Sequence, residues 1–181
     1  MLILMITTVF FLGNPGREYR DTRHNLAWLL LAQLPEASEL SWQRRHKGES
    51  ALCRLGSSTI FLHKPLTFMN KSGESISEVA GFFKTQADQI LIVHDEVELQ
   101  CGEIGLKFGG GLSGHNGLRS ASQHLGTKDF YRLRIGIGRP SRGDVSSFVL
   151  GKITEPEKVV IHAVFDAAGN LLREVCTQEP E

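Results

Sequence analysis

The sequence has 181 residues, of which 41% are hydrophobic and 22% are charged, and its 20 basic side chains balance 20 acidic ones. These values predict one soluble domain over residues 1–181, and zero net charge taken alone disfavours a polyanionic partner. Three scattered cysteines without a CxxC pair argue against a disulfide scaffold or a zinc site and favour the reducing cytoplasm.

The chain opens on an apolar run, which we interpret as a buried first strand at residues 3–12. A signal peptide is disfavoured because no Lys or Arg precedes the run and no clear small-residue cleavage site follows it. The run is also too short to span a bilayer, so we expect no membrane association.

Apolar runs and helical spacing alternate along the rest of the chain. The last helix is expected to use Thr154 as its N-cap, with Pro156 at the first helical position. This alternation predicts an α/β domain with a mixed, mostly parallel sheet flanked by helices on both faces. Strands are expected at residues 51–55, 58–62, 90–93, 104–108 and 131–137, and helices at residues 26–34, 73–83, 117–125 and 155–175.

The segment FGGGLSGHNGLRS, residues 108–120, is the part of the chain that packing alone explains least well. Its five glycines remove side chains where another molecule can approach, and His115 and Asn116 stand where a helix is expected to begin. This segment, GNPG after Leu12 and HDE after Val93 all follow apolar runs. We therefore expect the three loops to converge at one edge of the sheet.

Gly109, Gly111 and Gly114 also satisfy the GxGxxG pattern of dinucleotide-binding domains. The following strand runs into Gly138 instead of an acidic residue, so a nucleotide cofactor is disfavoured. GxxxxGK[ST] and GxSxG are absent from the sequence, which argues against P-loop chemistry and against a typical α/β serine hydrolase.

Histidine, carboxylate and amide side chains in the other motifs suit acid–base chemistry. Asp95 at a strand end can orient an imidazole and raise its basicity, but a turn cap explains it equally well. His24 in TRHN fits a base or a helix cap. Asn14, Asn70 and Asn116 fit amides that hold a peptide, or turn formers. HExxH and other short ligand spacings are absent, so we expect no metal.

Positive charge gathers in residues 101–152, which hold eight basic and three acidic side chains. Lys107, Arg134 and Arg139 lie beside the glycine segment or on the following strand. Such a group suits a phosphate, with glycine amides alongside. Solvated surface charge without a partner explains the same distribution.

Taken together, these residues resemble the bacterial peptidyl-tRNA hydrolase family, from Phe11 to about Gly169. The resemblance implies one α/β domain with a twisted mixed sheet. It also implies hydrolysis of the ester between a peptide and the 3′-terminal ribose of tRNA by a monomeric, cytoplasmic enzyme without cofactor or metal. The markers are GNPGREYRDTRHN (13–25), KPLTFMNKSGES (64–75), ILIVHDEVELQCG (90–102), KFGGGLSGHNGLRS (107–120), FYRLRIGIGRP (130–140) and FVLGK (148–152).

The same resemblance implies a role for each matching residue. His24 is expected to activate water, with Asp95 as its orienting carboxylate. One of three asparagines is expected to donate to the developing oxyanion, a role that we assign to Asn14. A cleft wall is expected from Tyr19, Phe68 and Met69, and amides that hold the peptide are expected from Asn70 and Asn116. His115 is expected beside the 3′ end of the tRNA. A clamp on the 5′-phosphate of the acceptor stem is expected from Lys107 and Arg134.

The sequence departs from the family pattern at four places, one of which is the segment after TRHN, NLAWLLL, which is one residue short. Phe11 stands where glycine is usual and is expected to narrow the floor of the cleft. Leu112 and Ser113 replace the more usual pair inside the glycine segment. The sequence ends after TQEPE without much of a basic tail, which predicts weaker tRNA binding.

Two other functions remain open at this point. A non-catalytic RNA-binding relative would share the fold, but it would have no need of a histidine–carboxylate pair. A general esterase that acts on small N-acylated substrates would need the pair but not the phosphate clamp.

Overall fold

The computed structural model describes residues 5–177, and the strands of this part of the chain form one seven-stranded sheet. Their order is β2-β3-β4-β1-β5-β7-β6, so the first strand lies near the middle of the sheet. The strands are β1 Thr8–Phe11, β2 Gln43–Arg45, β3 Gly48–Leu55, β4 Ser58–Pro65, β5 Ile90–Glu96, β6 Ile104–Phe108 and β7 Tyr131–Gly136.

Parallel pairing occupies the centre of the sheet, where β1 pairs with β4 and β5, and β5 pairs with β7. The pairs β2–β3, β3–β4 and β6–β7 are antiparallel. Every residue of β1 and β5 is buried, because central parallel strands are covered on both faces. The predicted mixed α/β class is confirmed.

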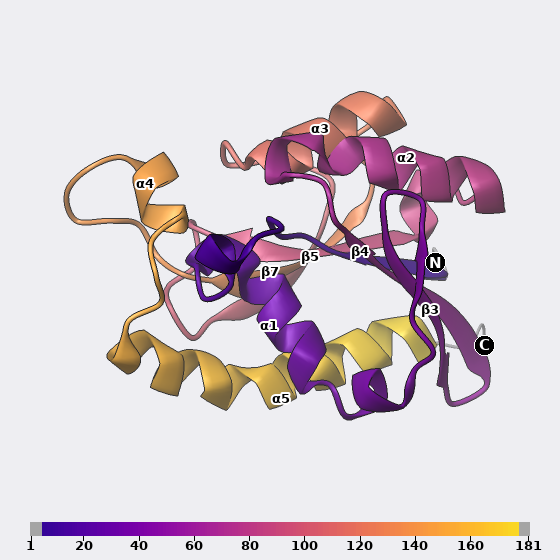
Figure 1. Ribbon diagram of the computed structural model, residues 1–181, viewed down its shortest axis with the longest axis horizontal. Coiled ribbons are helices and arrows are strands. Elements are labelled where there is room, and N and C mark those ends of the chain that lie inside the picture. Colours follow the sequence, from indigo (N-terminus) through magenta and orange to yellow (C-terminus); the bar gives the residue numbers. More distant parts are fainter. Residues whose placement is uncertain (1–4, 178–181) are drawn as a thin grey trace.

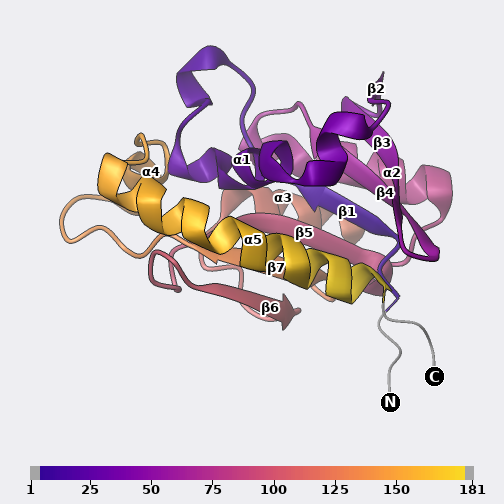
Figure 2. The ribbon, with the colours of Figure 1, turned by 90° about the horizontal axis from the view of Figure 1, so that it is seen from below.

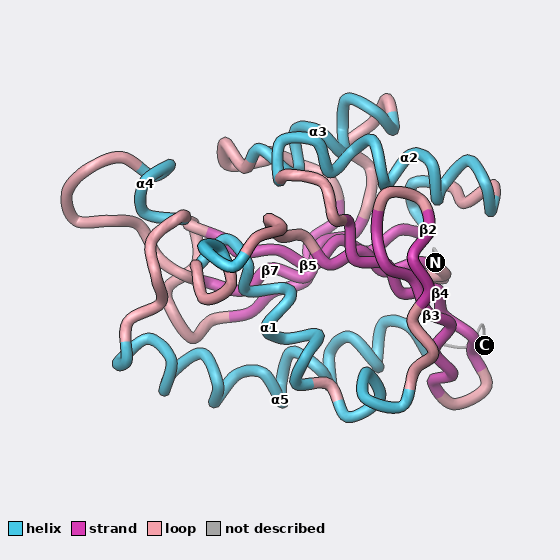
Figure 3. The backbone as a smooth tube through the Cα atoms, in the orientation of Figure 1, coloured by secondary structure: helices cyan, strands magenta, loops and turns pink. Residues whose placement is uncertain are grey.

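Two helical layers cover the sheet. Figure 1 shows α2 and α3 on one face and α1 with α5 on the other, and Figure 3 shows the strands between these helical layers. Seen from below, α5 runs across its face of the sheet, with β6 at one edge (Figure 2). The helices are α1 Leu26–Gln33, α2 Ser72–Phe83, α3 Asn116–Leu125, α4 Val145–Val149 and α5 Glu155–Thr177.

Each helical layer closes its own hydrophobic core, because successive side chains of a strand point to opposite faces. Phe10 belongs to the core under α2 and α3. Its neighbour Phe11 belongs to the core under α1 and α5. Both side chains are fully buried, so the central strands fix the two layers relative to each other.

The observed elements differ from the predicted ones mainly at their ends. The first strand covers Thr8–Phe11, and residues 3–4 of the predicted strand lie outside the described residues. Residues 94–96 belong to β5 and not to a loop, because they continue its ladder with β7. Neither β2 nor α4 was predicted, because the first is three exposed polar residues and the second is five residues long.

The start of α5 confirms the predicted cap. Glu157 N donates to Thr154 Oγ1 at 3.4 Å, and Thr154 N donates to the Glu157 carboxylate at 2.7 Å, which is the reciprocal capping-box pattern. The helix starts at Glu155, so Pro156 stands one position further in than predicted. Within residues 5–177, no helix has the length and apolar character that crossing a bilayer requires.

Candidate active site

The site lies where the carboxyl ends of β1 and β5 meet. Phe11 pairs with Val93, so the loop after β1 and the end of β5 reach the same edge of the sheet. A cleft of about 700 Å³ opens there. Nine of the eleven predicted site residues line it: Asn14, Tyr19, His24, Phe68, Met69, Asn70, Asp95, His115 and Asn116.

His24 and Asp95 form the buried polar centre of the cleft. His24 lies on the short 3₁₀ helix η2 (Arg23–Asn25), and its Nδ1 is 2.9 and 3.0 Å from the two carboxylate oxygens of Asp95. An ionised carboxylate only accepts, so Nδ1 donates and holds the ring proton. Among the described residues no group bonds to His24 Nε2, which leaves that nitrogen free to accept a proton from the cleft side.

His115 is the second histidine on the same carboxylate. Its Nδ1 accepts from the backbone N–H groups of Gly117 and Leu118 and caps the start of α3. The proton therefore sits on Nε2, which donates to Asp95 Oδ1 at 3.0 Å. Both ring nitrogens of His115 are engaged, so His24 is the histidine of the pair that has a nitrogen available.

Electrostatics separates the two histidines further. Burial would lower the pKa of His24, but the charge and hydrogen bond of Asp95 hold that pKa above its ordinary value of 6.5. Burial lowers the pKa of His115 despite its bond to the same carboxylate. Burial would raise the pKa of Asp95, whereas its histidine partners hold it well below its ordinary value. Asp95 is thus a permanent anion that favours a proton on His24.

Hydrogen bonds to both its side chain and its backbone hold Asn14 in place. Its Oδ1 accepts from Met69 N at 2.7 Å, and only the oxygen of an amide can accept, so its Nδ2 is left as a donor. Asn25 bonds to both the N–H and the carbonyl of Asn14, at 2.8 and 2.9 Å. The amide donor is therefore pre-oriented in the cleft, where Asn14 is 5% exposed.

Asn70 and Asn116 reach the cleft from two other elements. Asn70 lies on the 3₁₀ helix η4 (Met69–Lys71), and Asn116 is the first residue of α3. The two elements pack closely because Gly117 has no side chain: a Cβ there would meet Met69 Sδ at 2.5 Å. Both asparagines are exposed, so their amides can bind a molecule in the cleft.

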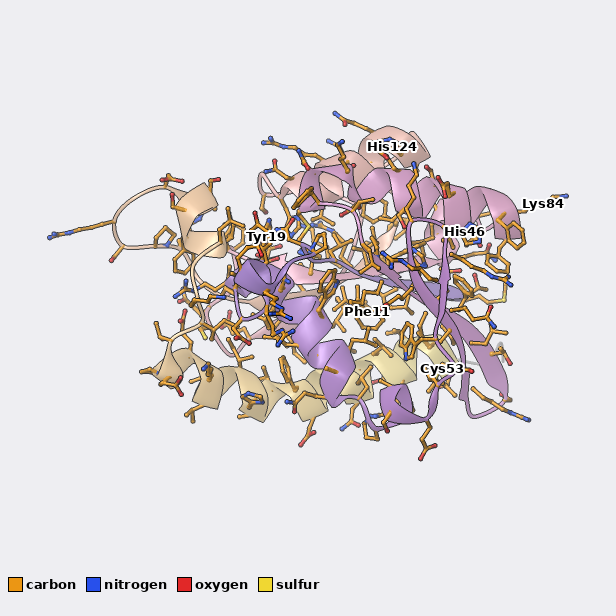
Figure 4. The ribbon with its side chains drawn as sticks, viewed as in Figure 1. Phe11, Tyr19, His46, Cys53, Lys84 and His124 are labelled. Atoms are coloured by element: carbon orange, nitrogen blue, oxygen red, sulfur yellow. The ribbon has the colours of Figure 1, made fainter. Side chains whose placement is uncertain are left out.

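The mouth of the cleft is aromatic and apolar. Tyr19 and Phe68 meet edge to face, with ring centroids 6.3 Å apart, and Phe68 is 53% exposed (Tyr19 is labelled in Figure 4). Another part of the lining comes from α4, which was not predicted because a five-residue helix leaves almost no periodic signal. The lining residues not predicted are Lys71, Glu96, Val97, Ser113, Gly114, Val145, Ser146, Val149 and Leu150.

Lys107 and Arg134 do not line the cleft. They lie on the neighbouring antiparallel strands β6 and β7, where Lys107 pairs with Arg132 and Gly105 pairs with Arg134. Registered partners point to the same face of a sheet, so the three cations share one face. Lys107 is exposed. The side chain of Arg134 is 19% exposed and lies 3.9 Å from the Glu96 carboxylate.

Two expectations about this region need correction. The three segments do meet at the cleft, as expected, but not because all three strands end there: β6 is antiparallel, so Phe108 pairs with Tyr131 and the glycine triplet starts at the opposite edge. The loop then returns to the cleft and delivers His115 and Asn116. Phe11 does not narrow the cleft floor, because its side chain packs in the core on the α1 and α5 side (Figure 4).

His63 is a buried histidine of a different kind. Its Nε2 bonds to the Ser75 hydroxyl and its Nδ1 to the Ser50 hydroxyl, both at 2.7 Å. Burial lowers the pKa of His63 to about 4, and the residue is not part of the cleft lining. With both nitrogens bonded inside the fold, His63 supports β3, β4 and α2 and has no access to a substrate in the cleft.

Within the described residues, His24, Asp95 and His115 are also the one group whose donor atoms could hold a metal ion, since these atoms lie within 4.8 Å of one another. Those atoms are already paired through two hydrogen-bonded protons. A metal would have to displace both protons, whereas proton transfer uses the arrangement as it stands. The geometry therefore suits activation of a water by His24 beside amide donors.

Comparison with known proteins gives one consistent result. A family model described as Peptidyl-tRNA hydrolase matches residues 8–181. The peptidyl-tRNA hydrolase of Treponema pallidum is 47% identical over 178 residues, which cover 96% of this chain and 86% of the relative. That of Neisseria meningitidis serogroup B is 44% identical over 163 residues, or 88% and 85% of the two chains. A crystal structure of peptidyl-tRNA hydrolase from Acinetobacter baumannii superposes with a TM-score of 0.89 at 35% identity, covering 97% of this chain and 91% of that one.

Proposed function

This chain belongs to the peptidyl-tRNA hydrolase family and hydrolyses the ester of peptidyl-tRNA, and we propose that His24 is the base that activates the water. The single observation that carries the proposal is the 2.9 Å bond from His24 Nδ1 to Asp95, with Nε2 left free on the cleft side. A base held in one tautomer by a buried carboxylate is ready to take a proton without rearranging.

The reaction has two steps: attack of water on the ester carbonyl and breakdown of the tetrahedral intermediate. His24 Nε2 takes a proton from water as its oxygen attacks the ester carbonyl, and Asp95 stabilises the imidazolium that forms. The tetrahedral intermediate then expels the 3′-oxygen of the ribose, and the proton on His24 passes to that oxygen. Free tRNA and the peptide acid are formed, the acid loses its proton to solvent to become a carboxylate, and His24 returns to its neutral state. An ester is reactive enough that this route needs no covalent enzyme intermediate.

The amides hold the reacting group. Asn14 Nδ2 is the donor for the developing oxyanion, because its oxygen is already committed to Met69 N. Asn70 and Asn116 hold peptide groups on either side of the ester, since an amide can both donate and accept. Tyr19, Phe68 and Met69 form the apolar wall against which the substrate packs.

The tRNA is bound mainly outside the cleft. Lys107 and Arg134 grip the 5′-phosphate of the acceptor stem, which lies near the 3′ end in any tRNA. A small cationic site on a protein with zero net charge gives local attraction without a strongly basic surface. We place the enzyme in the cytoplasm as a monomer, where its substrate forms and its free cysteines stay reduced.

The test compares two substrates. Purified protein is mixed with N-blocked aminoacyl-tRNA and, separately, with the methyl ester of the same N-blocked amino acid. Release of free tRNA with a kcat/KM at least about 100-fold above that for the small ester is expected, since remote binding energy accelerates the reaction. Equal rates would identify a general esterase, and tRNA binding without cleavage would identify a non-catalytic relative.

A further inference from the structure

Arg132 is the most deeply buried cation of the described residues. It lies in the middle of β7 and is 0% exposed. Its Nη2 donates to the carbonyl of Gly109 at 2.6 Å, whereas Nε and Nη1 have no partner among the described residues. Burying a guanidinium with unpaired donors is energetically unfavourable. A residue retained at that cost calls for a role beyond packing.

Gly109, whose carbonyl accepts the bond from Arg132, is the first residue of the glycine-rich stretch that leads to the cleft. Gly109 has φ +58° and donates its N–H to Phe130 O at 3.0 Å, so Arg132 completes the anchoring of its peptide groups. Among the described residues, Gly110 and Gly111 make no hydrogen bond of their own. Consecutive glycines have the most conformational freedom of any sequence, so this loop cannot define its own path.

The other end of the loop is the catalytic cleft. His115 N donates to Leu112 O, and His115 Nε2 donates to Asp95. A Cβ on Gly110 would lie 4.0 Å from Arg132 Nη2, so the loop passes directly over the guanidinium. Residues 109–115, which we call the glycine loop, are thus tied at one end by Arg132 and at the other by Asp95.

The neighbours of Arg132 do not make it a simple ion pair. Glu96 is the acidic group whose charge favours the protonated form of Arg132, and its carboxylate lies 3.9 Å from Arg134 and accepts from Glu98 N at 3.1 Å. Lys107 and Arg134 add positive charge on the same face. The one hydrogen bond of the Arg132 side chain among the described residues is the bond to the Gly109 carbonyl, which fixes the orientation of that peptide group.

We propose that Arg132 is a positioning residue for the hydrolysis: by fixing Gly109 it sets the path of the glycine loop and places His115 on Asp95 and Asn116 in the cleft. The proposal rests on the function proposed above. Under this proposal the strand β7 contributes to both parts of substrate recognition: Arg134 binds the 5′-phosphate, and Arg132 positions the loop beside the ester. The alternative role is a third phosphate contact beside Lys107 and Arg134.

Substrates with and without the 5′-phosphate separate these roles. Arg132→Met removes charge and donor, and Arg132→Gln keeps an amide donor. Lys107→Ala removes a proposed phosphate contact for comparison, and Arg54→Met, at an exposed arginine of β3, is the matched control. Arg132→Met is expected to lower kcat about tenfold or more on both substrates, because misplaced catalytic groups cost about two orders of magnitude per ångström. Lys107→Ala is expected to raise KM for the phosphorylated substrate alone. Arg132→Gln is expected to recover part of kcat.

A direct readout is the ring ¹⁵N–¹H signal of His115 Nε2, which the bond to Asp95 protects from exchange. This signal should broaden or disappear in Arg132→Met and return in Arg132→Gln. A purely structural arginine would lower the melting temperature while kcat per folded molecule and the His115 signal stayed unchanged, and that result overturns the proposal. An effect confined to the phosphorylated substrate overturns it as well.

Two further controls keep the outcome decisive. If Arg132→Met does not fold, Arg132→Lys keeps the charge but changes the geometry of the donor, and the same two kinetic signatures apply to it. If wild-type protein cleaves neither substrate, the proposed function fails, while the His115 signal still shows whether Arg132 sets the loop.

Discussion

Asn25 holds the backbone of Asn14 with both ends of one side-chain amide. Its Oδ1 accepts from Asn14 N at 2.8 Å, and its Nδ2 donates to Asn14 O at 2.9 Å. Asn25 is 1% exposed and sits next to His24 in the chain. The proposed base and the proposed oxyanion donor are therefore fixed to each other through a single residue that does not line the cleft.

Removing the two hydrogen bonds between Asn25 and Asn14 should lower kcat more than it weakens substrate binding. We expect Asn25→Ala to lower kcat by about 10- to 100-fold, because a small displacement of Asn14 misaligns its donor. Folding should lose about 1–3 kcal/mol, since two buried backbone groups lose their partners. Asn170→Ala removes an exposed asparagine of α5 and serves as the control. A KM effect with unchanged kcat would mean that Asn25 shapes the binding site and does not align the donor.

His24 and His63, two of the buried histidines, offer a matched pair of substitutions. His24→Ala should reduce kcat by about 10²–10⁴-fold while tRNA binding stays within a few-fold, since it deletes the base but no phosphate contact. His63→Ala leaves the buried Ser50 hydroxyl without its partner and removes one of the two partners of the Ser75 hydroxyl, so it should lower the melting temperature while the folded fraction keeps its kcat. Comparable loss of kcat per folded molecule in both variants would contradict the assignment of His24.

Much of the site could be predicted from sequence, because its residues stand in short ungapped motifs. GNPG, TRHN and HDE each carry a candidate site residue, Asn14, His24 and Asp95, and the ends of the parallel strands β1 and β5 bring the first and the third together. Tautomers could not be predicted. That His115 is a helix cap with no free nitrogen depends on the backbone of Gly117 and Leu118, which sequence patterns do not show.

The errors have a common physical origin. Strand direction is not encoded in an apolar run, so β6 was expected to end near the cleft although its antiparallel pairing sends Phe108 to the other edge. Phe11 was expected in the cleft because a motif comparison does not say which face a strand residue takes, and its neighbour Phe10 faces the other core. Burial of Arg132 was likewise invisible in a count of charges.

The pH dependence of the reaction should report the His24–Asp95 pair. The base acts in its neutral form, and Asp95 raises the pKa of His24, so kcat/KM should rise with pH through a midpoint above about 6.5. Asp95→Asn removes the charge and leaves the effect of burial, so this midpoint should move to lower pH as the plateau falls. An unmoved midpoint would assign the titration to another group.

The same shift has a signature in stability. The pKa of His24 is higher in the folded state than in the unfolded one, so the pair stabilises the protein fully below the unfolded pKa. This contribution is lost as the pH rises through the folded pKa. We therefore expect the difference in the free energy of unfolding between wild type and Asp95→Asn, measured by denaturant titration, to shrink between about pH 6 and 8 by the contribution of His24.

The last prediction concerns the phosphate clamp. Lys107→Ala and Arg134→Ala should raise KM for peptidyl-tRNA several-fold and change kcat by less than about twofold, because they remove binding remote from the bond that breaks. Each should make the log–log salt dependence of tRNA binding shallower by about 0.7–0.9 for one lost phosphate contact. Lys84→Gln removes an exposed cation at the end of α2 (Figure 4) and is the control.

The structure separates the two clamp variants further. Arg134 lies near the buried Glu96 carboxylate, whereas Lys107 is exposed and makes no ion pair among the described residues. Arg134→Ala should therefore also lower the melting temperature, because Glu96 loses a nearby positive charge, and Lys107→Ala should not. A substrate without the 5′-phosphate should be nearly indifferent to both changes in its KM. If that substrate suffered as much as the phosphorylated one, these residues would belong to the fold or the catalytic centre, and the clamp would be wrong.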